Sequence, residues 1–423
     1  MKLGWVDFSP EDRKRAIEAL DSLRERGAVD ELGIGALRDA FADAFFPGTS
    51  TLQTRAKYFV LVPCAVRMTL EKMSESPARR DGPGELRRIE RECARQMWEN
   101  CGGDESAGVI GRRNLGRSEW VLRPPSEIYW AGLRTFGISS VASSVGSWVG
   151  RTSRLTREAG LSPGRFGGDD EEGIADDADT RLVEWKAAFD LPRDVFRSFS
   201  EAYRAKTLSP DLTRREADFL AEKLLGSEKT RGSLLGTCLE KGVVPPIPVP
   251  ASDETPPGEE CSPFFRFVRS IRGFVSGETA FLLDQACAFN RLVFAARVLY
   301  NKRLAVPDSG AESVWKEIRP SVPGWMTADL PSVFRRFGIP RTGSLGMFLD
   351  NLQRAFRKRD FDRAEELMLK RECRIKGENR AKLLHPGNID PGKWIGGGWL
   401  DFRLANATRI LADIADAKGA GRA

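Results

Sequence analysis

The sequence is almost without histidine, because His385 is the only one among 423 residues. Paired-histidine phosphodiesterases, histidine-ligated metal centres and most Ser-His or Cys-His nucleophile systems depend on histidine in their working parts. His385 stands in LLHPGN, where the following proline favours a helix end or a turn. We therefore expect no catalytic residue of these classes.

Other common signatures are missing as well. Seven cysteines occur without any C-x-x-C pair, so neither a zinc cluster nor a disulfide framework is indicated, and we expect buried thiols. No G-x-x-x-x-G-K-[ST] motif is present, which excludes a P-loop NTPase. The longest apolar run, 58–66, is interrupted by Pro63 and is far shorter than the roughly 20 residues of a membrane span. We expect a cytoplasmic protein with no membrane segment, cofactor or metal.

The composition is that of a globular protein, with 41% apolar and 30% charged residues. A chain of this length exceeds the roughly 250 to 300 residues at which single cores stop growing, which predicts several subdomains. The net charge is +6, and 49 arginines stand against 17 lysines. Arginine suits bidentate recognition of phosphate and carboxylate, although a GC-rich genome would give the same bias.

Apolar spacing at i, i+3 and i+4 predicts a mainly α fold of multi-helix bundle subdomains. Ser9 and Pro10 open the first predicted helix, which carries Ala16 to Leu23, and Thr213 is a predicted N-cap. A long helix that is apolar on more than one face is predicted around 281–299. The other predicted helices cover residues 37–46, 55–72, 85–98, 126–136, 214–225, 234–239, 329–337, 344–357, 360–369 and 404–414.

Two segments are predicted to separate these helices. GGDDEEGIADDAD begins at Gly167, and up to Asp194 the chain holds ten acids against three bases. The second segment, from Val243 to Glu260, contains six prolines and cannot form a helix or a central strand. We therefore expect an N-terminal helical domain (1–166), an acidic flexible loop (167–180), a middle helical segment (181–242), a Pro-rich connector (243–260) and a C-terminal helical domain (261–423).

Basic residues gather in two segments, which we interpret as candidate nucleic-acid-binding surfaces. Between Gly108 and Gly160 there are eight arginines and three acids, and between Pro331 and Lys382 fourteen bases and seven acids. The second segment resembles a helix-turn-helix in outline; the alternative is a helical hairpin with a solvated basic face. The candidate binding residues are Arg112, Arg113, Arg117, Arg335, Arg336, Arg341, Arg354, Arg357 and Lys358.

Two glycine-rich segments are weak candidates for phosphate-binding loops. Gly108, Gly111 and Gly116 lack both the lysine and the preceding apolar strand of such loops. Gly396 to Gly398 lie between Trp394 and Trp399, a pattern more typical of a tight turn whose aromatic residues pack inward.

Several motifs together resemble an uncharacterised bacterial family, domain of unknown function 6361. They are the opening LGWVDFSPEDR, the run ELGIGALRDAFADAFFPGTSTLQTRAKYFVLVP, the segment GVIGRRNLGRSEWVLRPPSEIYWAGLRTFGI and the closing WLDFRLANATRILADI. The resemblance spans nearly the whole chain but brings no catalytic residue with it. It implies a place in antiphage defence, beside helicases and modification or restriction enzymes.

These observations lead to one expectation and two alternatives. We expect a non-enzymatic subunit of a multi-gene defence system, which bridges protein partners and also contacts DNA through its basic surfaces. One alternative is a metal-dependent nuclease built from scattered carboxylates, for which the runs 169–172 and 176–179 are the natural candidates. The other alternative is a scaffold that binds only proteins.

Overall fold

The computed structural model describes residues 30–75, 81–158, 188–246, 258–387 and 389–419. The predicted first helix, the acidic loop and the central part of the Pro-rich connector lie outside these residues. The described residues group into two compact units. The described residues of the α3 unit fall within Asp43–Pro248 and Arg403–Ala423. Those of the α13 unit fall within Met1–Ala42 and Val249–Phe402. The five-part division expected from composition stays a prediction.

The described residues are helical throughout, apart from turns, loops and one isolated bridge between Ser139 and Phe189, so the mainly α prediction is confirmed. The α3 unit contains α3 (Tyr58–Glu75), α4 (Gly82–Asn100), α5 (Pro125–Thr135), α6 (Val145–Glu158), α8 (Arg193–Ala205), α9 (Arg214–Gly226), α10 (Glu228–Arg231), α11 (Leu234–Lys241) and α19 (Leu404–Lys418). The α13 unit contains α12 (Pro263–Ile271), α13 (Gly277–Leu304), α14 (Ala311–Ile318), α15 (Val322–Trp325), α16 (Leu330–Phe337), α17 (Ser344–Arg357) and α18 (Phe361–Lys376). The boundary between the two units in the sequence follows Ala42, which lies within helix α2 (Gly35–Phe45).

Helix α3 forms the core of its unit. It packs against α4, α5, α6 and α8, and residues Tyr58 to Val66 are all buried. Helix α9 begins where the sequence predicts, because Thr213 and Glu216 form a reciprocal capping box. Helix α8 was not expected from the sequence, although Val195, Phe196 and Phe199 form its buried face.

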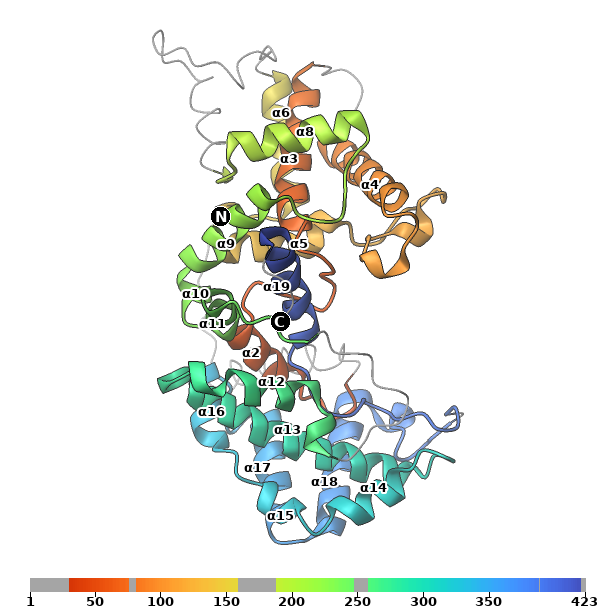
Figure 1. Ribbon diagram of the computed structural model, residues 1–423. Helices are drawn as coiled ribbons and strands as arrows, with labels where there is room; N and C mark the ends of the chain where they lie inside the picture. The colour runs from red at the N-terminus through yellow and green to blue at the C-terminus, as the bar shows by residue number, and fades with distance from the viewer. Residues whose placement is uncertain (1–29, 76–80, 159–187, 247–257, 388, 420–423) are drawn as a thin grey trace, which may run out of the picture. The chain divides into compact units, whose positions relative to one another are not determined.

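Helix α13 forms the core of the other unit. It packs against α14, α15 and α18, and seventeen of its 28 residues are buried, as expected for a central helix (Figure 1). Asn290 and Asn301 each exchange two hydrogen bonds with the backbone of the glycine-rich segment, at Leu400 and Ile395 respectively. Trp399 stacks on Phe294 with 3.7 Å between the ring centroids. The segment is therefore fixed to α13, in agreement with the tight turn favoured by the sequence.

No helix in the described part of the chain is long and apolar enough to cross a membrane. The cysteine side chains that the structure describes are all free thiols. The predicted burial holds for four of these six, whereas Cys101 and Cys373 are half-buried. The buried ones are Cys64, Cys93, Cys238 and Cys287.

A candidate anion-binding recess

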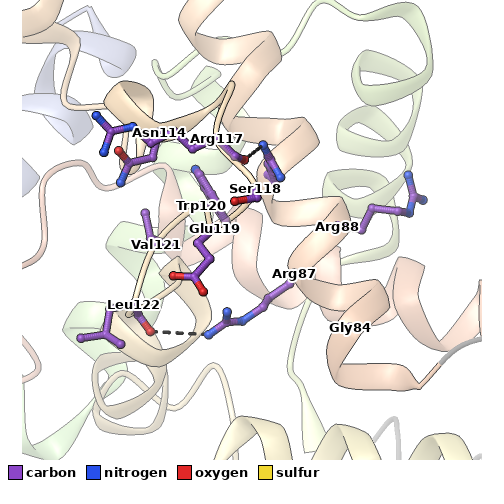
Figure 2. Close-up of a pocket in the computed structure, with 11 residues that line it drawn as sticks. Gly84, Arg87, Arg88, Asn114, Arg117, Ser118, Glu119, Trp120, Val121 and Leu122 are labelled. Carbon is purple, nitrogen blue, oxygen red and sulfur yellow. Dashed lines mark hydrogen bonds between the residues drawn. The ribbon is translucent and has the colours of Figure 1, made fainter.

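A recess of about 830 Å³ lies between α4 and the loop formed by residues 114–122 (Figure 2). Arg87, Arg88 and Arg91 line it from α4, and Arg117 lines it from the loop. Glu119 is the one acidic residue among the described residues that line it. All of these residues belong to the α3 unit, so the recess is formed within one compact body.

The amphipathic sequence of α4 places its arginines on the recess. The helix begins after Asp81 with Pro83 in its first turn, a position that proline favours. Its inner face buries Leu86, Ile89 and Cys93, among others. Arginines at i, i+1 and i+4 of such a helix fall outside the apolar stripe and near one another.

The loop is shaped by Gly111 and Trp120. Gly111 has φ +78°, and a Cβ atom there would lie only 2.2 Å from Nε1 of Trp120. Trp120 is buried, and its Nε1 donates a 3.2 Å hydrogen bond to the Gly111 carbonyl. The backbone N–H of Ile110 donates to the Tyr58 hydroxyl at 2.8 Å, which ties the start of the loop to α3. Only glycine combines this backbone conformation with this close approach.

Two arginines of α4 are bound to the loop backbone rather than to acids. Nη2 of Arg91 donates to the carbonyls of Leu115 and Arg117. The Arg87 guanidinium reaches the Leu122 carbonyl at 3.5 Å (Figure 2). Neutral carbonyls leave the guanidinium charge uncompensated. In addition, Nε of Arg91 is buried and has no hydrogen-bond partner among the described residues.

Arg88 differs from its two neighbours. It forms a two-pronged contact with the Glu85 carboxylate at 2.6 and 2.9 Å, and these hydrogen bonds raise the pKa of Arg88. A guanidinium that is already paired with a carboxylate attracts a further anion less strongly. Of the three α4 arginines, Arg87 and Arg91 therefore have more unused capacity for an anion than Arg88.

Of the three arginines expected in this region, only Arg117 lines the recess. Arg112 and Arg113 lie in the short helix η2 (Arg112–Asn114) and both face Glu105, at 3.3 and 3.6 Å. Arg112 also lies over the Trp98 ring, 5.9 Å from its centroid. The sequence did not identify Arg87, Arg88 or Arg91 as site residues, because their spacing predicts only that they lie on a helix.

All six candidate residues of the second basic segment are exposed, on or after α16 and α17. Three of them have partners: Arg336 pairs with Glu278, Arg341 with Asp350 at 2.7 Å, and Nε of Arg357 donates to the Met326 carbonyl at 2.7 Å. Arg354 makes a marginal 3.5 Å contact with Asn351. The side chains of Arg335 and Lys358 form no hydrogen bond or close ion pair with any residue that the structure describes.

Gly338, in the left-handed conformation at φ +64°, ends α16. Residues 338–343 connect α16 to α17. The helix–turn–helix outline is thus present in the chain. Its contact with nucleic-acid phosphates stays a prediction.

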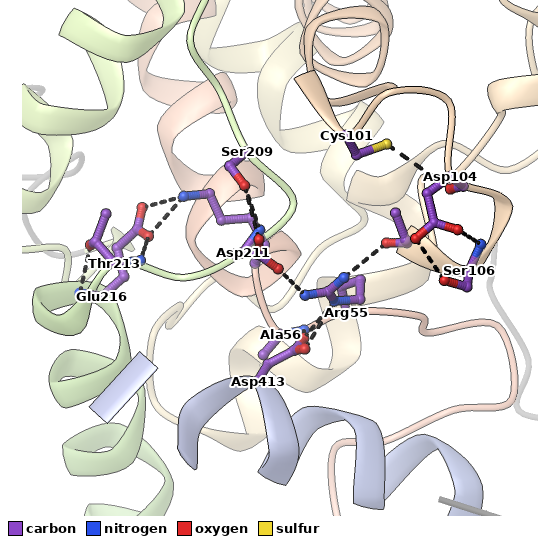
Figure 3. Close-up of polar contacts among 12 residues, drawn as sticks. Arg55, Ala56, Cys101, Asp104, Ser106, Ser209, Asp211, Thr213, Glu216 and Asp413 are labelled. Carbon is purple, nitrogen blue, oxygen red and sulfur yellow. Dashed lines mark hydrogen bonds and ion pairs between the residues drawn. The ribbon is translucent and has the colours of Figure 1, made fainter. Parts of the chain in front are cut away.

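A second polar cluster in the α3 unit is fully paired (Figure 3). Arg55 contacts Asp413 at 2.9 Å, Asp211 at 2.6 Å and the Ala107 carbonyl at 3.0 Å. Burial raises the pKa of Asp413 despite the neighbouring Arg55. Each donor has an acceptor, so the cluster holds the segment before α3 against α19 and the loop at 107 and is not a vacant site.

Lys57, two residues after Arg55 in the chain, pairs with Glu216. Its Nζ contacts the two carboxylate oxygens at 2.8 and 2.7 Å, with both side chains buried. The pair joins the start of α3 to the first turn of α9.

Among the parts of the chain that the structure describes, no group of three or more His, Cys, Asp or Glu is placed to hold a metal ion. The acidic runs on which the nuclease alternative depends, 169–172 and 176–179, lie outside those parts.

Comparison with known proteins adds one match. No curated protein and no solved structure matches the chain. The segment of the chain that one family model matches contains the whole recess, from Gly84 to Leu122. The closing motif WLDFR lies after the matched segment. Residues 1–161 match the model described as a family of unknown function (DUF6361), which confirms over these residues the resemblance found in the sequence.

Proposed function

We propose that this protein is a non-enzymatic subunit that binds nucleic acid through the phosphate backbone and bridges protein partners in a bacterial antiphage defence assembly. The observation that carries the binding function is the recess between α4 and the 114–122 loop. Among the described residues four arginines line it, and three of these, Arg87, Arg91 and Arg117, have no carboxylate within ion-pair distance. The ligand is thus expected to be an anion with several oxygen acceptors.

Phosphate fits this description better than a single carboxylate does. The guanidinium fork matches phosphate geometry, and hydrogen bonds to a charged acceptor are about twice as strong as those to a neutral carbonyl. A nucleic acid would also present more than one phosphate to Arg87, Arg91 and Arg117. The release of counterions on phosphate neutralisation would add affinity that depends on salt and not on sequence.

The second basic segment supports the same function from the α13 unit. Arg335, Arg354 and Lys358 are exposed and lack a carboxylate partner among the described residues. Cations of this kind on a helical surface are the usual source of phosphate contacts. We assign this segment a supporting role in binding.

The defence assembly and the bridging role rest on the family resemblance of the N-terminal residues. Native protein purified from its host should bring companion proteins with it, and a helicase or a DNA-modification enzyme is expected among them. Purification as a single species would remove the bridging role and leave the nucleic-acid function standing alone.

The binding function is tested with the purified full-length chain and fluorescently labelled oligonucleotides, titrated at several salt concentrations. We expect binding at low salt that weakens linearly in log[salt]. Absence of binding at low salt would favour the scaffold that binds only proteins. Divalent-metal-dependent cleavage of the oligonucleotide, lost on addition of a chelator, would favour the nuclease alternative.

A further inference from the structure

We infer that the recess selects single-stranded nucleic acid over duplex, an inference that rests on the proposed function. Its shape is the first reason. A duplex is bound by elements that project into its grooves or by surfaces that run along its phosphates. A recess between a helix and a loop instead admits one narrow chain, as the grooves of single-strand-binding proteins do.

The spacing of the arginines is the second reason. Arg87 and Arg91 lie four residues apart on α4, which separates their Cα atoms by about 6 Å along the helix axis. Successive phosphates of one strand are separated by a similar distance. One strand lying along α4 would therefore place neighbouring phosphates at the two guanidinium groups that are not paired with acids.

The mouth of the recess supplies the third reason. Leu122 lies at the edge of the recess with 90% of its surface exposed, and the structure describes no other large apolar side chain that is as exposed. A single strand has unstacked bases that can cover an apolar side chain, whereas the bases of a duplex are stacked inside. Glu119, in the same wall, would repel a ligand that brings more than a few phosphates.

The experiment compares the full-length protein on a labelled single strand of about 20 nucleotides, as DNA and as RNA, and on the corresponding duplex. We expect both single strands to bind more tightly than the duplexes. Arg87→Ala should weaken single-strand binding roughly tenfold and reduce the salt slope by about 0.7. The Arg87 side chain is exposed and makes a single long hydrogen bond within the described part of the chain, so this variant should fold normally.

Arg95→Ala is the matched control, because Arg95 lies on the same helix outside the recess and pairs with Glu92 at 2.5 Å. It should bind like the wild type. Leu122→Ala should weaken binding of single strands and leave binding of duplex unchanged, and Glu119→Gln should strengthen single-strand binding.

The outcomes separate the inference from the proposed function on which it rests. Duplex binding equal to or tighter than single-strand binding overturns the inference and leaves nucleic-acid binding standing. Equal losses in Arg87→Ala and Arg95→Ala place the ligand outside the recess and overturn the inference too. Failure of every oligonucleotide to bind removes both.

Discussion

The Glu90 carboxylate accepts a 2.6 Å hydrogen bond from the backbone N–H of Ser126, in the interior of the α3 unit. The second carboxylate oxygen lies 3.2 Å from the Ser126 hydroxyl. Burial raises the pKa of Glu90 to about 8, because the hydrogen bonds from Ser126 and the charge of Arg87 offset only part of the lost hydration. Helix α5 is thereby attached at its N-terminal turn to α4, beside the recess-lining arginines.

This attachment predicts a pH dependence of stability. Because the folded pKa lies above the ordinary value of 4.5, the folded state holds a proton that the unfolded state releases. The contribution of Glu90 to the free energy of unfolding is fully present below pH 4.5. It is lost as the pH rises towards 8, by at most about 1.4 kcal/mol per pH unit. Glu90→Gln should raise the melting temperature at pH 8.5 and change it little at pH 5. Glu99→Gln, exposed on the same helix, should have no such effect; equal melting curves for Glu90→Gln and wild type at pH 8.5 would contradict the assignment.

The buried pair of Lys57 and Glu216 should be sensitive to the loss of one partner. Lys57→Met leaves the Glu216 carboxylate buried without its cation and should cost about 3 to 5 kcal/mol in the free energy of unfolding. Adding Glu216→Gln, whose carbonyl oxygen can still accept the Thr213 N–H, should recover part of this loss. Denaturant unfolding of the single and double variants gives the coupling energy. Additive effects would show that the pair is not coupled.

Gly111 should be intolerant of a side chain. Gly111→Ala places a Cβ atom 2.2 Å from Trp120 in a backbone conformation with φ +78°, and we expect a destabilisation of more than about 2 kcal/mol. Gly102→Ala is the control, because its φ is +65° and a Cβ there meets nothing within 4 Å. It should show only the cost of the backbone conformation, about 1 to 2 kcal/mol. Equal melting temperatures of the two variants would show that the loop tolerates the shift.

Different substitutions in the second basic segment should affect either nucleic-acid binding or the free energy of unfolding. Replacing Arg335, Arg354 and Lys358 together by Ala should weaken nucleic-acid binding about equally for all sequences and change the free energy of unfolding by less than about 0.5 kcal/mol per site. Arg357→Ala should instead destabilise the α13 unit, because its Nε holds the buried Met326 carbonyl. Binding titrations and denaturant unfolding measure the two effects. Loss confined to particular base sequences would indicate groove reading instead.

Most of the helices could be predicted because their signals are local. Thr213 and Glu216 are three residues apart, and the apolar residues of α13 repeat along one segment. Helix α8 was missed because the charged flank up to Asp194 obscured its start at Arg193. The spacing of Val195, Phe196 and Phe199 was the signal that could have identified it.

The site was predictable only in part. Arg117 stands in a visibly basic segment, so local charge was enough to select it. Arg87 and Arg91 belong to an ordinary amphipathic helix, and they line a recess only because the loop carrying Arg117 folds back over them. That contact depends on the fit of Trp120 against Gly111, which periodicity and composition do not encode.

The most direct test of the central claim is photocrosslinking of the full-length protein to a single strand that carries 4-thiothymidine, followed by mass-spectrometric mapping of the crosslinked peptides. We predict crosslinks in residues 84–91 and 114–122, which Arg87→Ala reduces and Arg95→Ala does not. Crosslinks found only outside these two segments would contradict the assignment of the recess as the nucleic-acid site.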